Sequence, residues 1–286
     1  MTHIKKIFAA LLVTALLVTS FSLLAQAAAA NLKFLVLGDS IAAGSGVYIN
    51  SEKRAYAPLV AAAKGYDLTN HGAGGDTSAR LLRKVQESDV IRQAIRQADI
   101  IAVSIGGNDL PHAEDFSAMV INGLLGDYSG IDPVLAAYRE NFAAIIEGIR
   151  ALNPGALLIV QTLYNPAFPL PSLRKAYGEA VRGLNAEIRG YLAAHPGAFV
   201  VADVYAAFEQ RRGAVFVDMT HPSGYGHRVI AAVLLATIDE TPDRLPWIPG
   251  ILEAMLWIFK PVLALLDWIG IGGFLRVGYG IAQRVG

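Results

Sequence analysis

The run from Leu32 to Ser40 ends in a serine that is well placed to act as a nucleophile. Its apolar residues stop at Gly38-Asp39, directly before Ser40. This pattern predicts a buried first strand that turns sharply into a helix, with Ser40 at the turn. In open parallel sheets the functional residues lie at the carboxyl ends of the strands, so Ser40 is a candidate nucleophile.

A serine hydroxyl needs a base, and the segment Asp218-Met219-Thr220-His221-Pro222 contains the best candidate. An imidazole takes the proton from the hydroxyl, and an acid orients the imidazole. Pro222 disfavours helical geometry at His221, which predicts a turn or an extended loop. In such a loop Asp218 can reach Nδ1 of His221 and leave Nε2 free for Ser40.

Attack on an ester carbonyl creates an oxyanion, which needs preorganised hydrogen-bond donors. Gly75 lies in a glycine-rich turn after the second expected strand, and Asn108 lies in Gly106-Gly107-Asn108-Asp109 after the third. A glycine turn exposes backbone N–H groups, and an asparagine adds an amide donor. Because neighbouring parallel strands end at one edge, we expect Gly75 and Asn108 to lie near Ser40.

The elements that must position these residues alternate regularly between Asn31 and Ile238. We expect further strands at 66–70, 99–105, 156–163 and 198–204, and helices at 57–64, 77–97, 132–152, 172–194 and 223–238. This alternation predicts a parallel sheet with helices on both sides. Segment 110–130 has no firm period and is interpreted as a long loop with room for one helical turn.

The composition limits the possible partners. The chain has 24 Lys and Arg residues and 24 Asp and Glu residues, so its formal charge is zero. A zero net charge gives no electrostatic support for nucleic-acid binding. The chain contains no cysteine, which excludes disulfides, thiolate metal sites and a cysteine nucleophile.

The amino-terminal residues have the pattern of a secretory signal peptide. Lys5 and Lys6 precede an apolar segment, and Ala25-Gln26-Ala27 forms a small-x-small cleavage site. We expect residues 1–27 to be removed and the protein to be exported, either secreted or extracytoplasmic. An uncleaved membrane anchor is the alternative.

The carboxyl-terminal residues 245–286 differ from the rest of the chain. Ile251 to Leu275 is almost wholly apolar, and its charges Glu253, Lys260 and Asp267 recur every seven residues, on one stripe of a helix. We expect an apolar helical extension that contacts a membrane surface through residues 250–275. Packing on the domain and dimerisation remain as alternatives.

The motifs in this order and spacing resemble the SGNH or GDSL hydrolases. The matching blocks are Gly38-Asp39-Ser40, Gly75 in its turn, Gly106-Gly107-Asn108-Asp109 and Asp218 to Pro222. The resemblance covers residues 31–240 and is greatest to exported bacterial lipases and esterases of the thioesterase and lysophospholipase type.

The resemblance implies a flavodoxin-like three-layer α/β/α fold with five parallel strands in the order 2-1-3-4-5. It also implies that Ser40 is the nucleophile, His221 the base and then the acid, and Asp218 its orienting carboxylate. The oxyanion hole would consist of the backbone N–H groups of Ser40 and Gly75 and the amide of Asn108. No cofactor or metal is implied.

Three other assignments fit the residues less well. In the α/β-hydrolase fold the serine lies in Gly-x-Ser-x-Gly, and the acid and the histidine follow different strands. A phosphate-binding loop would need Gly-Lys-Ser/Thr, which residues 72–78 lack. Asp39, Asp76 and Asp109 have no metal-ligand spacing behind them.

The predicted function is hydrolysis of small-molecule or lipid esters through an acyl-serine intermediate. The apolar segment Met119 to Leu125 and the aromatic, proline-rich segment Tyr164 to Leu170 favour an acyl or lipid ester. An O-acetyl esterase or acyltransferase on cell-wall carbohydrate and a non-catalytic surface-binding module are the alternatives, because specificity depends on loops. The sequence assigns neither substrate-binding residues nor an oligomeric state.

Overall fold

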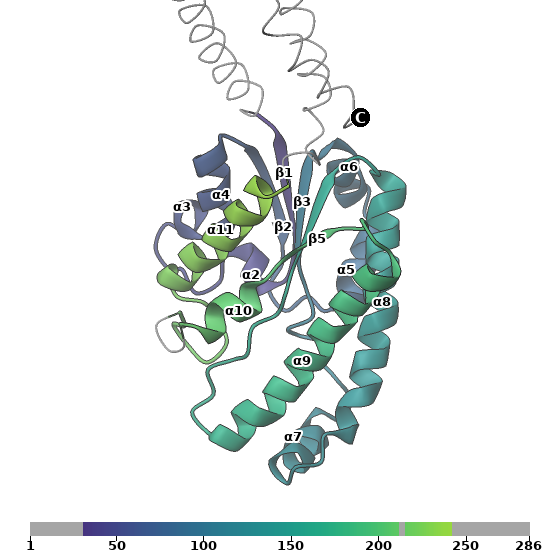
Figure 1. The fold of residues 1–286 in the computed structure, drawn as a ribbon, viewed down its shortest axis with the longest axis vertical. Helices are drawn as coiled ribbons and strands as arrows, with labels where there is room; N and C mark the ends of the chain where they lie inside the picture. The colour runs from purple at the N-terminus through teal and green to yellow at the C-terminus, as the bar shows by residue number, and fades with distance from the viewer. Residues whose placement is uncertain (1–30, 212–214, 242–286) are drawn as a thin grey trace, which may run out of the picture. The chain divides into compact units, whose positions relative to one another are not determined.

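The computed structural model describes residues 31–211 and 215–241, which build a parallel sheet covered by helices on both sides (Figure 1). The five strands lie in the order β2-β1-β3-β4-β5, and every neighbouring pair is parallel. This confirms the three-layer fold and the strand order 2-1-3-4-5. The expected signal peptide at 1–27 and the apolar extension at 245–286 lie outside the described residues.

The three central strands are apolar except at their ends because both of their faces are covered. They are β1 (Lys33–Gly38), β3 (Ile100–Ser104) and β4 (Leu157–Gln161), and nearly all of their residues are buried. Continuous runs of this kind are typical of parallel sheets between two helical layers. The edge strands β2 (Asp67–Gly72) and β5 (Val200–Ala202) are more exposed, and β2 is mostly polar.

The helices form one layer on each side of the sheet (Figure 1). One layer contains α3 (Ser51–Arg54), α4 (Tyr56–Lys64), α10 (Val204–Glu209) and α11 (Gly224–Asp239). The other contains α5 (Ser78–Glu87), α6 (Asp89–Gln97), α8 (Asp132–Leu152) and α9 (Pro171–Ala194). The short α2 (Ser40–Ala43) follows β1 directly, and α7 (Phe116–Leu124) packs against α9, close to the 3-10 turn Ser129–Ile131.

An aromatic cluster fixes the second helical layer on the sheet. Tyr138 and Phe142 of α8 stack with ring centroids 5.6 Å apart, and Phe199 meets Phe142 edge to face at 5.8 Å. All three side chains are almost fully buried. Such pairs contribute beyond their buried area, so this layer provides a rigid support for the loops at the strand ends.

The single helix expected at 77–97 is wrong, because the chain forms two helices that meet at Ser88. Ser88 is extended, with φ −82° and ψ 110°, and its hydroxyl accepts a hydrogen bond from the N–H of Ile91 at 3.4 Å. A serine that caps a new helix interrupts the old one even where the apolar period continues.

Segment 110–130 contains a nine-residue helix, α7, where the sequence indicated at most one turn. Met119 packs into a small apolar cluster with Leu110, Ile131 and Ala180. A Cβ built on Gly123 would lie 3.0 Å from Cβ of Ala176 in α9, so this glycine permits the close approach. Tertiary packing, rather than a local apolar period, therefore stabilises α7.

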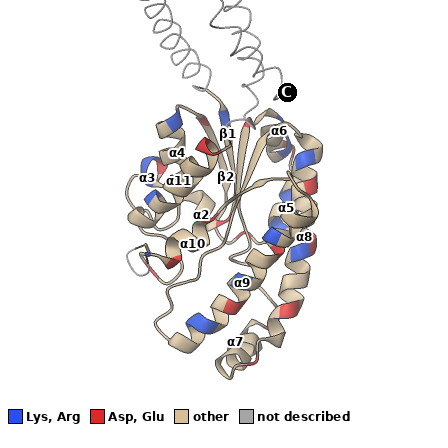
Figure 2. Ribbon diagram, in the orientation of Figure 1, with Lys and Arg blue, Asp and Glu red and all other residues tan. Residues whose placement is uncertain are grey.

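Charged residues of both signs are interspersed along the helices (Figure 2). Arg139 and Glu187 join α8 to α9 through a bidentate ion pair, in which Nε lies 2.6 Å from Oε2 and Nη2 lies 2.7 Å from Oε1. Within residues 31–211 and 215–241, no helix combines the length and the apolar character needed to cross a bilayer.

Candidate active site

The turn from β1 into α2 places Ser40 as the sequence predicts. Gly38 has φ +142°, and a Cβ there would overlap the carbonyl oxygen of Ser104 in β3, so only glycine fits. Asp39 caps α2 because its Oδ1 accepts from the N–H of Ile41 at 2.9 Å. Ser40 is the first residue of α2, and its N–H therefore has no partner within the helix.

Asp39 is a buried carboxyl group directly beside Ser40. Only 3% of its surface is exposed, and burial raises the pKa of Asp39 to about 7. The N–H of Ile41 and the ring of His221 oppose this rise, whereas Asp109 and Asp76 add to it. At neutral pH this group is thus close to its own titration midpoint.

The loop that carries His221 is held by Asp218. Oδ1 of Asp218 accepts from the backbone N–H groups of His221 at 2.6 Å and Thr220 at 2.7 Å, while Oδ2 lies 2.9 Å from Nδ1 of His221. Burial works to raise the pKa of Asp218, but these hydrogen bonds outweigh it and lower the pKa to about 2. An ionised carboxylate only accepts hydrogen bonds, so Nδ1 carries the proton and Nε2 keeps a free lone pair.

Tyr164 anchors this loop from the end of β4, a role that the sequence did not indicate. Its hydroxyl donates to the carbonyl oxygen of Thr220 at 2.7 Å, next to His221. The ring stacks on Phe208 with centroids 4.5 Å apart. Burial raises the pKa of Tyr164, so the phenol remains a donor. An aromatic residue just after a central strand was the only sequence signal for this contact.

The two loops proposed to carry the oxyanion donors are joined to one another. Nδ2 of Asn108 donates to the carbonyl oxygen of Asp76 at 3.0 Å. Oδ2 of Asp109 accepts from the N–H of Ser78 at 3.0 Å, and the Ser78 hydroxyl contacts Oδ1. Gly75 has φ +77° and open space around the position of a Cβ, so its backbone conformation, not packing, favours glycine.

One cavity of about 180 Å³ brings most of these residues together. Ser40, Asn108 and His221 all line it, and Asp218 stands behind His221 through the ring contact. Gly75 is not among the described residues that line this cavity, but the Asn108–Asp76 bond ties its turn to the cavity wall. The described part of the chain contains no group of three or more side chains arranged to hold a metal ion.

The buried histidine of α11 has a different role. Nδ1 of His227 accepts from the N–H of Tyr56 at 3.2 Å, and Nε2 donates to the carbonyl oxygen of Ser45 at 2.9 Å. Burial lowers the pKa of His227, which keeps the ring neutral. Both ring nitrogens are therefore occupied in joining α11 to α4 and to the loop after α2.

The fold and the residues at its carboxyl edge define a hydrolase of the GDSL type. The model of the GDSL-like lipase/acylhydrolase family matches residues 36–229, and the chain belongs to this family. Membership supports ester hydrolysis as the class of reaction. The uncharacterized protein YpmR of Bacillus subtilis (strain 168) is 28% identical over 215 residues, and the match covers 71% of this chain and 80% of YpmR.

Solved structures with the same fold include lipases and esterases. The lipase Lip_vut3 from a goat rumen metagenome matches 72% of this chain and 97% of its own with a TM-score of 0.60 and 21% identity. Phospholipase A1 from Streptomyces albidoflavus NA297 matches 73% of this chain and 100% of its own with a TM-score of 0.55 and 18% identity. A catalytic mutant of the acetylxylan esterase Axe2 from Geobacillus stearothermophilus matches 73% of this chain and 94% of its own with a TM-score of 0.52 and 19% identity. These likenesses show the fold.

Proposed function

We propose that this chain is a serine carboxylic ester hydrolase that works through an acyl-serine intermediate. Ser40 is the nucleophile, His221 the general base and then the general acid, and Asp218 the carboxylate that orients the imidazole. The observation that carries the proposal is that Ser40 and His221 line one cavity while Asp218 holds Nδ1 of His221 at 2.9 Å.

Acylation begins when Oγ of Ser40 attacks the ester carbonyl carbon and Nε2 of His221 takes the hydroxyl proton. The ionised Asp218 stabilises the resulting imidazolium. The bond between the carbonyl carbon and the alcohol oxygen then breaks, and the alcohol leaves with the proton from Nε2. Water repeats the sequence on the acyl-serine, which releases the acid and restores Ser40.

Three donors stabilise the oxyanion in this proposal. They are the N–H groups of Ser40 and Gly75 and the side-chain amide of Asn108. The Ser40 N–H is free of intrahelical bonding, and the Asn108 amide keeps a second hydrogen after its bond to Asp76. Donors fixed before the reaction need no reorganisation when charge develops on the carbonyl oxygen.

Hydrolysis of p-nitrophenyl butanoate tests this mechanism. We expect Ser40→Ala and His221→Ala each to lower kcat by about 10⁴-fold or more. Ser117→Ala, an exposed serine of α7, is the matched control and should retain wild-type turnover. A fluorophosphonate probe should label Ser40 in the wild type. Equal turnover in the wild type and Ser40→Ala would refute the mechanism, and no turnover of any ester would favour the binding-module alternative.

Export and contact with a membrane surface are also proposed, on the sequence of the two chain ends. Removal of residues 245–286 should weaken binding to vesicles of phosphatidylcholine with phosphatidylglycerol and leave small-ester turnover in place. Sedimentation with vesicles measures the first effect, and p-nitrophenyl butanoate the second. Unchanged vesicle binding would remove the argument for the extension.

A further inference from the structure

The cavity that Ser40 lines has apolar walls on the side of α9. Leu163 follows β4 and lines this cavity together with Ala180 and Leu184 of α9. Ala180 and Leu184 are only 1% and 3% exposed, so the part of the cavity wall that they form lies in the protein interior. A hydrocarbon chain attached to Ser40 can bury itself against these walls and leave water.

The cavity volume limits the size of such a chain. At about 180 Å³ it exceeds the 150 Å³ of an apolar protein cavity that holds one benzene molecule. A linear acyl chain of about six to eight carbons therefore fits, on the same comparison. An acetyl group would leave most of the apolar wall uncovered.

Leu163 lies where the cavity wall meets the loop that leads to Asn108. A Cβ built on Gly106 would be 3.2 Å from Cδ1 of Leu163, and one built on Gly107 would be 3.8 Å from Cδ2. The two methyl groups thus lean on the backbone next to the proposed oxyanion donor. A shift of Leu163 would change the width of the cavity close to the reacting carbon.

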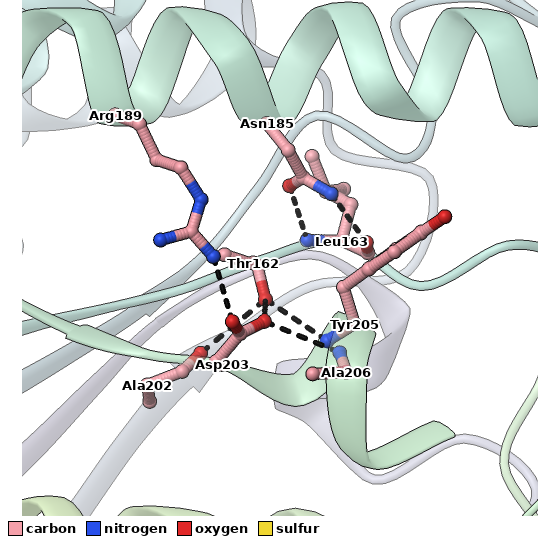
Figure 3. Close-up of polar contacts among 8 residues, drawn as sticks. All are labelled: Thr162, Leu163, Asn185, Arg189, Ala202, Asp203, Tyr205 and Ala206. Carbon is pink, nitrogen blue, oxygen red and sulfur yellow. Dashed lines mark hydrogen bonds and ion pairs between the residues drawn. The ribbon is translucent and has the colours of Figure 1, made fainter. Parts of the chain in front are cut away.

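Asn185 holds the backbone of Leu163 from α9. Its Oδ1 accepts from the N–H of Leu163 and its Nδ2 donates to the carbonyl oxygen, both at 2.8 Å (Figure 3). The pairing of β4 with β5 ends at Gln161. The asparagine amide therefore takes the place of a strand partner at Leu163 and fixes that residue beyond the end of the sheet.

A second anchor from α9 supports the preceding residue. Nη2 of Arg189, one turn after Asn185, lies 2.7 Å from Oδ2 of Asp203. The hydroxyl of Thr162 donates to Oδ1 of Asp203 at 3.0 Å. The same hydroxyl oxygen, Oγ1 of Thr162, accepts from the N–H of Tyr205 at 2.9 Å (Figure 3). The end of β4 is thus tied to α9 at two successive residues.

We propose that Leu163 and Ala180 form the acyl chain-length selector of this site, with Asn185 as the positioning residue for Leu163. The preferred acyl group is a linear chain of about six to eight carbons. This inference rests on the proposed function, because it names the substrate class of the same cavity.

The ratio of kcat/KM for p-nitrophenyl octanoate to that for p-nitrophenyl acetate measures the selector. Each buried methylene contributes about fourfold, so Ala180→Leu, which fills the space of two to three methylenes, should lower the ratio by roughly 15- to 60-fold. Ala193→Leu makes the same substitution at an exposed position of α9 and should leave the ratio unchanged. An equal ratio in Ala180→Leu and wild type would overturn the selector.

Leu163→Ala and Asn185→Ala test the opposite wall, and they decide the question even if Ala180→Leu does not fold. Leu163→Ala widens the cavity and should raise the ratio of dodecanoate to octanoate turnover by about fourfold or more. Asn185→Ala should shift the same ratio in the same direction. A residue with a merely structural role would lower turnover of both esters equally, and that result would contradict the assignment of Asn185.

The two proposals fail in different ways. If the wild type hydrolyses no ester, the proposed function is wrong, and calorimetric binding of octanoate against acetate to wild type and Ala180→Leu still tests the selector. Tighter binding of octanoate that is lost in Ala180→Leu would support it. If Ser40→Ala abolishes turnover but acetate is the best wild-type substrate, the mechanism stands and the selector is wrong.

Discussion

The amide of Asn108 donates to the carbonyl oxygen of Asp76 at 3.0 Å and so joins the loop after β3 to the turn that contains Gly75. An asparagine amide has two hydrogens, and this bond uses one of them. The other remains available in the cavity that Asn108 lines. The bond therefore fixes the orientation of the amide and keeps two separate loops in register.

Asn108→Ala should lower kcat by about 10²- to 10³-fold with a smaller change in KM, because it removes a donor that acts on the developing oxyanion. Steady-state kinetics with p-nitrophenyl butanoate measures this effect. Asn122→Ala, at an exposed position of α7, is the control. A change in KM alone would mean that the amide binds the ground state.

Tyr164→Phe removes the hydroxyl that donates to Thr220 at 2.7 Å but retains the ring stack on Phe208. We expect a loss of about 1 kcal/mol in the free energy of unfolding and a lower kcat, because the loop of His221 loses its anchor. Urea unfolding and ester kinetics measure the two effects. Tyr225→Phe, at an exposed position of α11, is the control and should change neither the free energy of unfolding nor kcat. An unaltered kcat in Tyr164→Phe would show that this anchor does not contribute to catalysis.

Asp39→Asn should make stability less dependent on pH. The folded-state pKa of Asp39, about 7, lies above the ordinary aspartate value of 3.8, so the folded state binds more protons and wild-type stability falls as pH rises from about 4 to about 7. At pH 8 the variant should gain up to about 4 kcal/mol over wild type, and at pH 4 little.

Urea unfolding at pH 4 and pH 8 measures this difference. The asparagine can still accept the hydrogen bond from Ile41 through its amide oxygen. Asp67→Asn on the edge strand β2 controls for the loss of a surface charge. A gain of the same size at both pH values would show that Asp39 does not titrate as proposed.

Gly38→Ala and Gly190→Ala should have opposite effects. A Cβ on Gly38 overlaps the carbonyl oxygen of Ser104, and φ there is +142°, so we expect a loss of more than about 3 kcal/mol or failure to fold. Gly190 lies within α9 with open space around it, so alanine should add up to about 1 kcal/mol. Thermal or urea unfolding of both variants decides, and a stable Gly38→Ala would contradict the strained turn.

Short-range features of this protein were determined by the sequence alone. The apolar runs predict β1, β3 and β4, because both faces of these strands are buried. The turn at Gly38 requires a glycine, and the three-residue spacing allows Asp218 to reach Nδ1 of His221 within one loop. The family motifs added the strand order, which no local pattern contains.

The tertiary structure decided the features that depend on residues far apart in the chain. The helix α7, the anchor from Tyr164 to Thr220 and the bonds from Asn185 to Leu163 all had weak or contrary local signals. Hydrogen bonding and burial across long sequence separations outweigh local propensity at these positions. The loop contacts that determine which ester enters the cavity therefore depend on how α9 packs at the end of β4.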